Sequence, residues 1–434
     1  MYKKINDMAY TDFIAAIDLG TSRIVGMVGK KNEHGVLSII AYEVENSGNC
    51  IRRGCVYNVE ETANKIKRLV RKLENKLHEA KIEKVYVGVG GQSLRSINHT
   101  VPRVLGTEGV VTDEIISSLH AECLNFHPDM LDVLAAVSPV YYLDNKPEAN
   151  PVGIPCTRIE AKYKLIVGRP SLKRHIINSI AERAQITIAG IIVSPLALSD
   201  AVLNDDERDL GCALIGFGAG VTTLTVYKGG KLLHLSVIPL GSNLITRDIT
   251  SLHLPESEAE RVKQTYGSAM MDQDNDQSIQ VSQADGLGMR EIKLSDLNNV
   301  VEARMGEILE NVYARLDAIE MEGTLGAGIV ITGGGAALKS LPEVIRKRTK
   351  MEVRYAATRR GIVASGELEA GNPSYASAVG LLLNGTENCA GYVPPAYVVE
   401  PGPFMEDPIE VPPMPKSEPV KPSKPKPEKK QGGL

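Results

Sequence analysis

Three glycine-rich turns are the segments of this sequence best suited to binding phosphate groups. Each follows an apolar run, and they are Asp18–Arg23, Gly216–Thr223 and Thr332–Ala336. Glycine permits positive φ and lets the backbone approach a ligand closely, and successive amide N–H groups in such turns bind anions. A single glycine hairpin is more often only a tight turn. Three of them after apolar strands indicate a nucleotide site.

Carboxylates are scarce in these turns, and this limits the chemistry that we expect. Asp18 lies in the first turn and could organise Mg²⁺, but the second turn has Gly216 in the corresponding place. Phosphoryl transfer depends on positioned water and on stabilisation of the transition-state charge. Loss of one positioned polar group often costs ~10²–10³-fold in rate. The sequence lacks the Walker, GxGxxG-βαβ, HExxH and GxSxG motifs.

The elements that must position the first two turns occur twice along the chain. A β-β-β-α-β-α pattern begins near Phe13 and again near Ala213. Two copies of one plan predict a duplicated domain, and a nucleotide would lie between the halves. We expect a first core at 12–84 and 166–203, an inserted α+β subdomain at 85–165, a second core at 204–245 and 324–390, a helical subdomain at 246–323 with a mobile loop at 267–291, and a disordered linker at 391–434.

Composition excludes several classes of protein. The formal net charge of −4 gives no basic footprint for nucleic acid. The six cysteines lack metal-ligand spacing, which favours reduced thiols in an intracellular protein. No apolar run reaches the ~18–20 residues of a membrane-spanning helix, so we expect any membrane contact to be peripheral. The proline- and lysine-rich C-terminal segment cannot form a packed core.

This combination resembles the actin superfamily and, within it, the FtsA family of bacterial cell-division proteins. The most discriminating feature is the insert at Gly91–Leu165, because FtsA proteins carry a small α+β subdomain in the first half, where actin and MreB have a different one. The resemblance implies an α/β fold with duplicated actin-like (ribonuclease H-like) domains and a helical subdomain in the second half. The segments that carry it are Ile17–Arg23, Val85–Gly91, Asn150–Gly153, Val226–Gly230, Val237–Pro239, Gly328–Gly335 and Tyr375–Leu382.

The resemblance also implies a site for ATP and Mg²⁺ between the halves. Asp18 would hold Mg²⁺ through water. Glu260 and Lys263 would border the purine and ribose, although a solvated i, i+3 ion pair would have the same spacing. The other expected contacts are Gly20, Thr21, Ser22 and Arg23 to the β- and γ-phosphates, Gly218, Ala219, Gly220 and Val221 to the phosphates from the other side, and Gly333, Gly334, Gly335 and Ala336 to the adenosine.

Two departures from the superfamily pattern bear on hydrolysis. The second phosphate turn usually begins with aspartate, where this chain has Gly216, and DnaK-type relatives have a Glu-Pro step where this chain has Ser194-Pro195. Only Asp18 then remains near the metal. We expect the chain to bind ATP, to hydrolyse it slowly or not at all, and to use it as a conformational switch.

The resemblance implies protein and membrane partners as well. FtsA proteins bind the C-terminal tail of FtsZ through the helical subdomain, where Glu302, Arg304 and Glu307 match, although a charged helix face could equally be solvated surface. They form head-to-tail filaments, meet other divisome proteins and lie on the inner face of the cell membrane through a C-terminal amphipathic helix. We expect this chain to end before such a helix. The alternatives are a PilM-like pilus-assembly adaptor and a sugar-kinase-like phosphotransferase.

Overall fold

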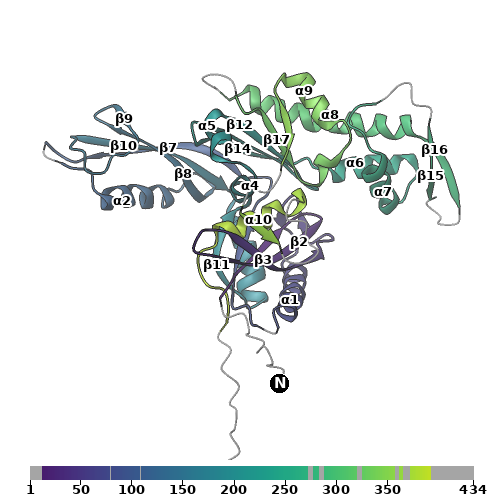
Figure 1. The fold of residues 1–434 in the computed structure, drawn as a ribbon, viewed down its shortest axis with the longest axis horizontal. Helices are drawn as coiled ribbons and strands as arrows, with labels where there is room; N and C mark the ends of the chain where they lie inside the picture. The colour runs from purple at the N-terminus through teal and green to yellow at the C-terminus, as the bar shows by residue number, and fades with distance from the viewer. Residues whose placement is uncertain are drawn as a thin grey trace, which may run out of the picture. The chain divides into compact units, whose positions relative to one another are not determined.

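The computed structural model contains two main β-sheets, whose arrangement is drawn in Figure 1. Of the linker predicted at 391–434, only Gly391 is among the described residues. The segment that concerns the expected membrane helix is therefore outside the described part of the chain. None of the described helices is long and apolar enough to cross a membrane. The description covers residues 12–391 with the exception of 79, 108, 272–276, 283–287, 320–324, 357–360 and 365–371.

The first sheet has the strand order β11-β6-β1-β2-β3-β19. β1 and β2 form an antiparallel hairpin, β6 runs parallel to β1, and β11 runs parallel to β6. Its strands are β1 (Ile14–Leu19), β2 (Arg23–Lys31), β3 (Leu37–Asn46), β6 (Lys84–Val89), β11 (Thr187–Val193) and β19 (Ile362–Ala364), and a separate hairpin consists of β4 (Ile51–Arg52) and β5 (Cys55–Val56).

The helices of the first half pack on this sheet through predicted apolar stripes. Helix α1 (Val59–Lys76) buries Ile66, Leu69 and Leu73, and its N-terminus is capped by Asn58. Helix α10 (Ala376–Asn384) crosses α4 (Ser194–Val202) so closely that a Cβ at Gly380 would lie 1.9 Å from the carbonyl oxygen of Ala197. The crossing therefore requires glycine. The remaining helical segments are α3 (Pro170–Ile177), the π-helical turn η1 (Asn178–Arg183) and the 3-10 turn η4 (Pro373–Tyr375).

The second sheet repeats the first. Its strands β18-β17-β12-β13-β14 have the same order and directions as β11-β6-β1-β2-β3. Asp18 is the fifth of six residues in β1, and Gly216 is the fifth of six in β12. This confirms the predicted duplication. The strands are β12 (Cys212–Phe217), β13 (Thr222–Lys228), β14 (Lys231–Ile238), β17 (Ile329–Thr332) and β18 (Val353–Tyr355).

The insert continues the second sheet in the order β7-β10-β8-β9. Ser236 of β14 pairs with Arg95 of β7 at the junction. The predicted insert limit at Val85 falls inside β6, which belongs to the first sheet because Tyr86 pairs with Ala16; the other domain limits remain predictions. The insert contains β7 (Arg95–Val104), α2 (Asp113–Leu124), β8 (Asp132–Leu143), β9 (Lys146–Glu148) and β10 (Arg158–Gly168).

The helical part of the second half contains one element that the sequence did not predict. The segment 267–291, expected to be a mobile loop, contributes to the hairpin β15 (Ser278–Ser282) and β16 (Met289–Lys293). Ile279, Val281 and Ile292 are buried, so the hairpin packs on the core. The other elements are α5 (Asp205–Leu210), α6 (Asn243–Ile249), η2 (Thr250–Leu252), α7 (Glu256–Tyr266), α8 (Leu294–Asp317), η3 (Gly334–Ala337) and α9 (Leu341–Thr349).

Candidate nucleotide site

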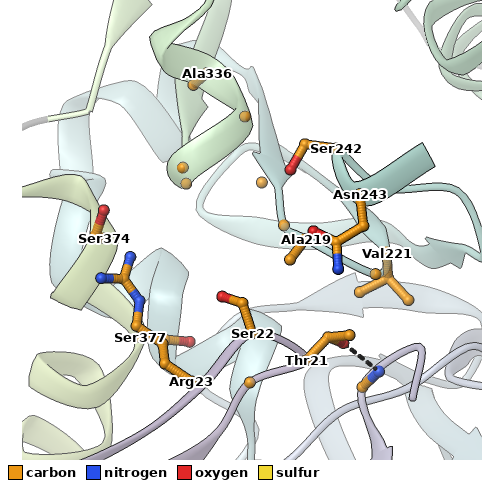
Figure 2. Close-up of a pocket in the computed structure, with 18 of the residues that line it drawn as sticks. Thr21, Ser22, Arg23, Ala219, Val221, Ser242, Asn243, Ala336, Ser374 and Ser377 are labelled. Atoms are coloured by element: carbon orange, nitrogen blue, oxygen red, sulfur yellow. Dashed lines mark hydrogen bonds between the residues drawn. The ribbon is translucent and has the colours of Figure 1, made fainter. Parts of the chain in front are cut away.

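A cavity of about 1450 Å³ lies between the hairpin turns of the two sheets. Every residue that the sequence predicted to contact ATP or Mg²⁺ lines it. Figure 2 shows Thr21, Ser22 and Arg23 on one side and Ala219 and Val221 on the other. The predicted residues that the structure brings together here are Asp18, Gly20, Thr21, Ser22, Arg23, Gly218, Ala219, Gly220, Val221, Glu260, Lys263, Gly333, Gly334, Gly335 and Ala336.

The first two turns present backbone amides from opposite sides. The Ser47 hydroxyl donates a 2.6 Å hydrogen bond to the Gly20 carbonyl, and the Gly218 amide donates a 2.9 Å bond to the Val221 carbonyl. A Cβ at Gly220 would lie 2.5 Å from Thr21 Oγ1, so the two turns touch. Across the described chain, no acceptor is bonded to the amides of Thr21, Ser22, Ala219 or Gly220. These amides can therefore bind an anion.

The third turn forms another wall of the cavity. Gly333 has φ of 88°, and a Cβ there would lie 2.5 Å from the carbonyl oxygen of Phe217, so this position requires glycine. Gly334, in contrast, has no atom within 4 Å of its Cβ position. The backbone of Gly334 is therefore open to the cavity at its Cβ position.

Asp18 is the carboxylate that lines the cavity beside the first glycine turn. Burial raises its pKa to about 6, while the neighbouring positive charge of Arg23 acts in the opposite direction. The described residues contain no cluster of three or more His, Cys, Asp or Glu side chains suited to a metal ion. A hydrated Mg²⁺ held through water needs only one such group, and a divalent cation would favour the ionised form of Asp18.

At Gly216, where the superfamily usually has aspartate, the neighbouring Thr223 occupies the space that a side chain would need. Gly216 pairs across the hairpin with Thr223, and a Cβ at Gly216 would lie 2.5 Å from Thr223 Oγ1. Both residues line the cavity, as does Ser194. The other carboxylates among the described lining residues are Glu256 and Glu260 of α7. The part of the cavity around the first two turns is thus lined by hydroxyls and glycines, with Asp18 as its carboxylate.

Lys263 is buried and Glu260 is partly exposed, so their pair differs from the fully solvated pair considered from the sequence. The Lys263 side chain is only 7% exposed, and its Nζ donates to Glu260 Oε2 at 2.6 Å and to Thr246 Oγ1 at 2.8 Å. Burial raises the pKa of Glu260, but the hydrogen bonds from Lys263 and Thr246 outweigh it and hold this pKa below its ordinary value. The pair is a fixed, polar edge of the cavity.

Comparison with known proteins identifies the family. The sequence profile of the family described as "Cell division protein FtsA" matches residues 213–380. A protein of that name from Porphyromonas gingivalis is 37% identical over 381 residues, which cover 87% of this chain and 79% of the relative. The chain belongs to the FtsA family.

Solved structures agree with an actin-like fold. The PilM–PilN type IV pilus biogenesis complex matches with a TM-score of 0.59 and 16% identity, over 85% of this chain and 97% of the matched one. An MreB protein of Spiroplasma citri, bound to ADP, matches with a TM-score of 0.51 and 13% identity, over 85% and 95%. At these identities the likeness shows the fold alone. The predicted α/β fold of the FtsA-family chain is confirmed.

A fourth segment of the cavity was missed in the sequence. Ser242 and Asn243 line it near Ala219 (Figure 2). Their amides donate 2.9 Å hydrogen bonds to the carbonyls of Gly218 and Ala219. This segment follows β14 and begins with Gly241, and a Cβ at Gly241 would lie 2.5 Å from the Ala219 carbonyl oxygen. The Gly241-Ser-Asn243 sequence could have indicated a further turn. Its contact with the second turn, however, joins residues more than twenty positions apart, which the sequence pattern does not reveal.

The residues predicted to bind FtsZ lie outside this cavity, on α8. Arg304 forms ion pairs with Asp248 of α6 and with Glu307 on its own helix. Glu302 Oε2 accepts a 2.8 Å hydrogen bond from the Met271 amide. All three predicted residues in this FtsA-family chain are therefore engaged in contacts within the molecule, and their role toward a partner remains a prediction.

Proposed function

We propose that this FtsA-family chain binds ATP with Mg²⁺ in the cavity and hydrolyses it slowly or not at all. The observation that carries this proposal is the meeting of three glycine turns around one cavity with free amides on two of them. Asp18 would hold the hydrated metal, Arg23 and the turn amides would bind phosphates, and the Gly333–Ala336 turn would hold the adenosine. Bound Mg²⁺ would neutralise charge on the β- and γ-phosphates.

The surroundings of Gly216 support slow turnover. An attacking water needs a carboxylate or amide to orient it, and near the phosphate turns the described lining offers Thr223, Ser194 and Asp18. If Asp18 holds the metal, the attacking water is left without a general base. ATP then acts by binding, and its release resets the conformation.

We propose further that the chain polymerises head to tail and connects FtsZ to the inner face of the cytoplasmic membrane during division. Membership of the FtsA family supports this proposal. The MreB relative, whose crystal structure contains ADP, supports the nucleotide part through its fold. Glu302, Arg304 and Glu307 are the residues proposed to meet the FtsZ tail, with membrane attachment through an amphipathic helix.

A pull-down with a synthetic FtsZ C-terminal tail peptide tests the partner. Wild-type protein should be retained, and Arg304→Glu should weaken retention because it reverses the charge on this face and breaks the pairs with Asp248 and Glu307. Arg315→Glu, an exposed change of the same charge on the same helix, serves as the control. Equal retention of the two variants would remove Arg304 from the site.

The second candidate is a PilM-like adaptor, favoured by the fold match to the PilM–PilN complex. The same pull-down, run with a short pilus-protein N-terminal peptide, distinguishes the two. Retention on the pilus peptide but not on the FtsZ tail would replace the first proposal with the second.

A further inference from the structure

The Arg23 guanidinium has free hydrogen-bonding capacity at the wall of the cavity. It lines the cavity at the start of β2, and it forms neither a hydrogen bond nor an ion pair with any residue that the structure describes. The guanidinium lies over the ring of Tyr375, whose centroid is 5.3 Å from Arg23 Cζ. Arginine that stacks by its planar face keeps its N–H donors free in the plane for phosphate.

Tyr375 is held in place from two directions. Its amide donates a 3.1 Å hydrogen bond to the Asn372 carbonyl, which fixes the η4 turn. Its ring packs at a tilt against the ring of Tyr42, with centroids 5.8 Å apart. The Lys76 ammonium lies over the ring of Tyr42. Figure 2 shows Arg23 on the same side of the cavity as Ser374 and Ser377, which flank Tyr375 in sequence. The ring is thus a rigid support for Arg23.

We propose that Tyr375 is a positioning residue that orients Arg23 to bind the terminal phosphate of a nucleoside triphosphate. The cation–π contact holds the guanidinium before the ligand arrives, which reduces the conformational entropy lost on binding. Bidentate arginine–phosphate bonds depend on this orientation. Tyr375 immediately precedes α10, which packs on α4, so the same contact links the phosphate end to the crossing helices. This inference rests on the proposed binding of ATP.

Binding titrations of ATP, ADP and adenosine to the full chain test the proposal. Tyr375→Leu should weaken ATP binding about two- to fivefold, the worth of one partly exposed cation–π contact, and should leave adenosine binding unchanged. Tyr375→Phe retains the ring and should bind ATP as the wild type does. Tyr42→Leu, which removes the neighbouring ring that does not touch Arg23, is the matched control and should have the smaller effect.

A double-mutant cycle separates positioning from general packing. In the Arg23→Met background, Tyr375→Leu should cause no further loss of ATP affinity, because its effect acts through Arg23. Additive losses, or equal losses for ATP and adenosine, would overturn the proposal, as would ATP binding unchanged by Tyr375→Leu. If Tyr375→Leu does not fold, Tyr375→Met replaces it in the same cycle. A wild type that binds none of the three ligands would instead refute the ATP site, and the inference with it.

Discussion

Asp18→Asn should make this protein more stable while it weakens binding of Mg²⁺-ATP. The side chain lies at the wall of the cavity, where burial raises its pKa from 3.8 to about 6. At neutral pH the protein therefore contains an ionised carboxylate in surroundings that disfavour the charge. Asparagine has nearly the same shape and no charge, so it removes this cost and also removes the group proposed to hold the metal.

The size of the effect follows from the pKa. A shift of one unit corresponds to about 1.4 kcal/mol, so the charge costs at most about 3 kcal/mol of folding free energy. The full amount is an upper limit because Asp18 borders the cavity, which water can enter. Since the folded-state pKa is raised, the unfolded chain loses its proton first as the pH rises from about 4 to 6, and the cost develops across this window. It is absent below the unfolded pKa and complete above about pH 6.

Thermal and denaturant unfolding of both proteins at several pH values measures this difference. Asp18→Asn should be more stable than the wild type at pH 7, and the two should converge near pH 4. Titration with Mg²⁺-ATP at pH 7 should show weaker binding by the variant. Equal stability of the two proteins at every pH, or a variant destabilised at pH 7, would refute the electrostatic reasoning.

Three further substitutions test other parts of the cavity. Gly334→Gln should fold normally and weaken ATP binding at least about tenfold (~1.4 kcal/mol), because its Cβ position is open; Gly306→Gln on α8, where the Cβ position is also open, is the control, and similar binding by both would contradict the placement of adenosine. Gly216→Asp combined with Thr223→Ala should raise phosphate release above that of Thr223→Ala alone, since the threonine hydroxyl occupies the space that the new side chain needs; no increase would mean that the missing carboxylate does not limit turnover. Lys263→Met should lower the free energy of unfolding by about 1–2 kcal/mol, because Glu260 loses its buried hydrogen-bond donor; thermal unfolding measures this. The difference should shrink at acid pH, where Glu260 is protonated, and a difference that does not shrink would count against this explanation.

The first two glycine turns were predictable as hairpins because their signals are local. Each is a buried run that leads into a glycine-containing turn, and Asp18 and Gly216 fall at the same position of matching strands. In these elements the chain's own periodicity decides the structure.

The features that were missed depend on contacts distant in sequence. The i, i+3 spacing of Glu260 and Lys263 does not reveal that Lys263 is buried or that it donates to Ser242 and Thr246 on another segment. The hairpin of β15 and β16 has short, mixed strands, and only packing of Ile279 and Val281 distinguishes it from a loop. The stacking of Arg23 on Tyr375 joins residues from opposite ends of the chain, which no local pattern predicts.

A single-turnover experiment tests the central claim most directly. Excess protein is mixed with Mg²⁺ and ATP labelled in the γ-phosphate, and both the bound nucleotide and its conversion to ADP are followed in time. The cavity with Gly216 in its second turn predicts that nucleotide is retained as ATP and converted more slowly than roughly 1 s⁻¹, the lower end of ordinary enzymatic rates. Conversion faster than this, or no retained nucleotide at all, would contradict the account.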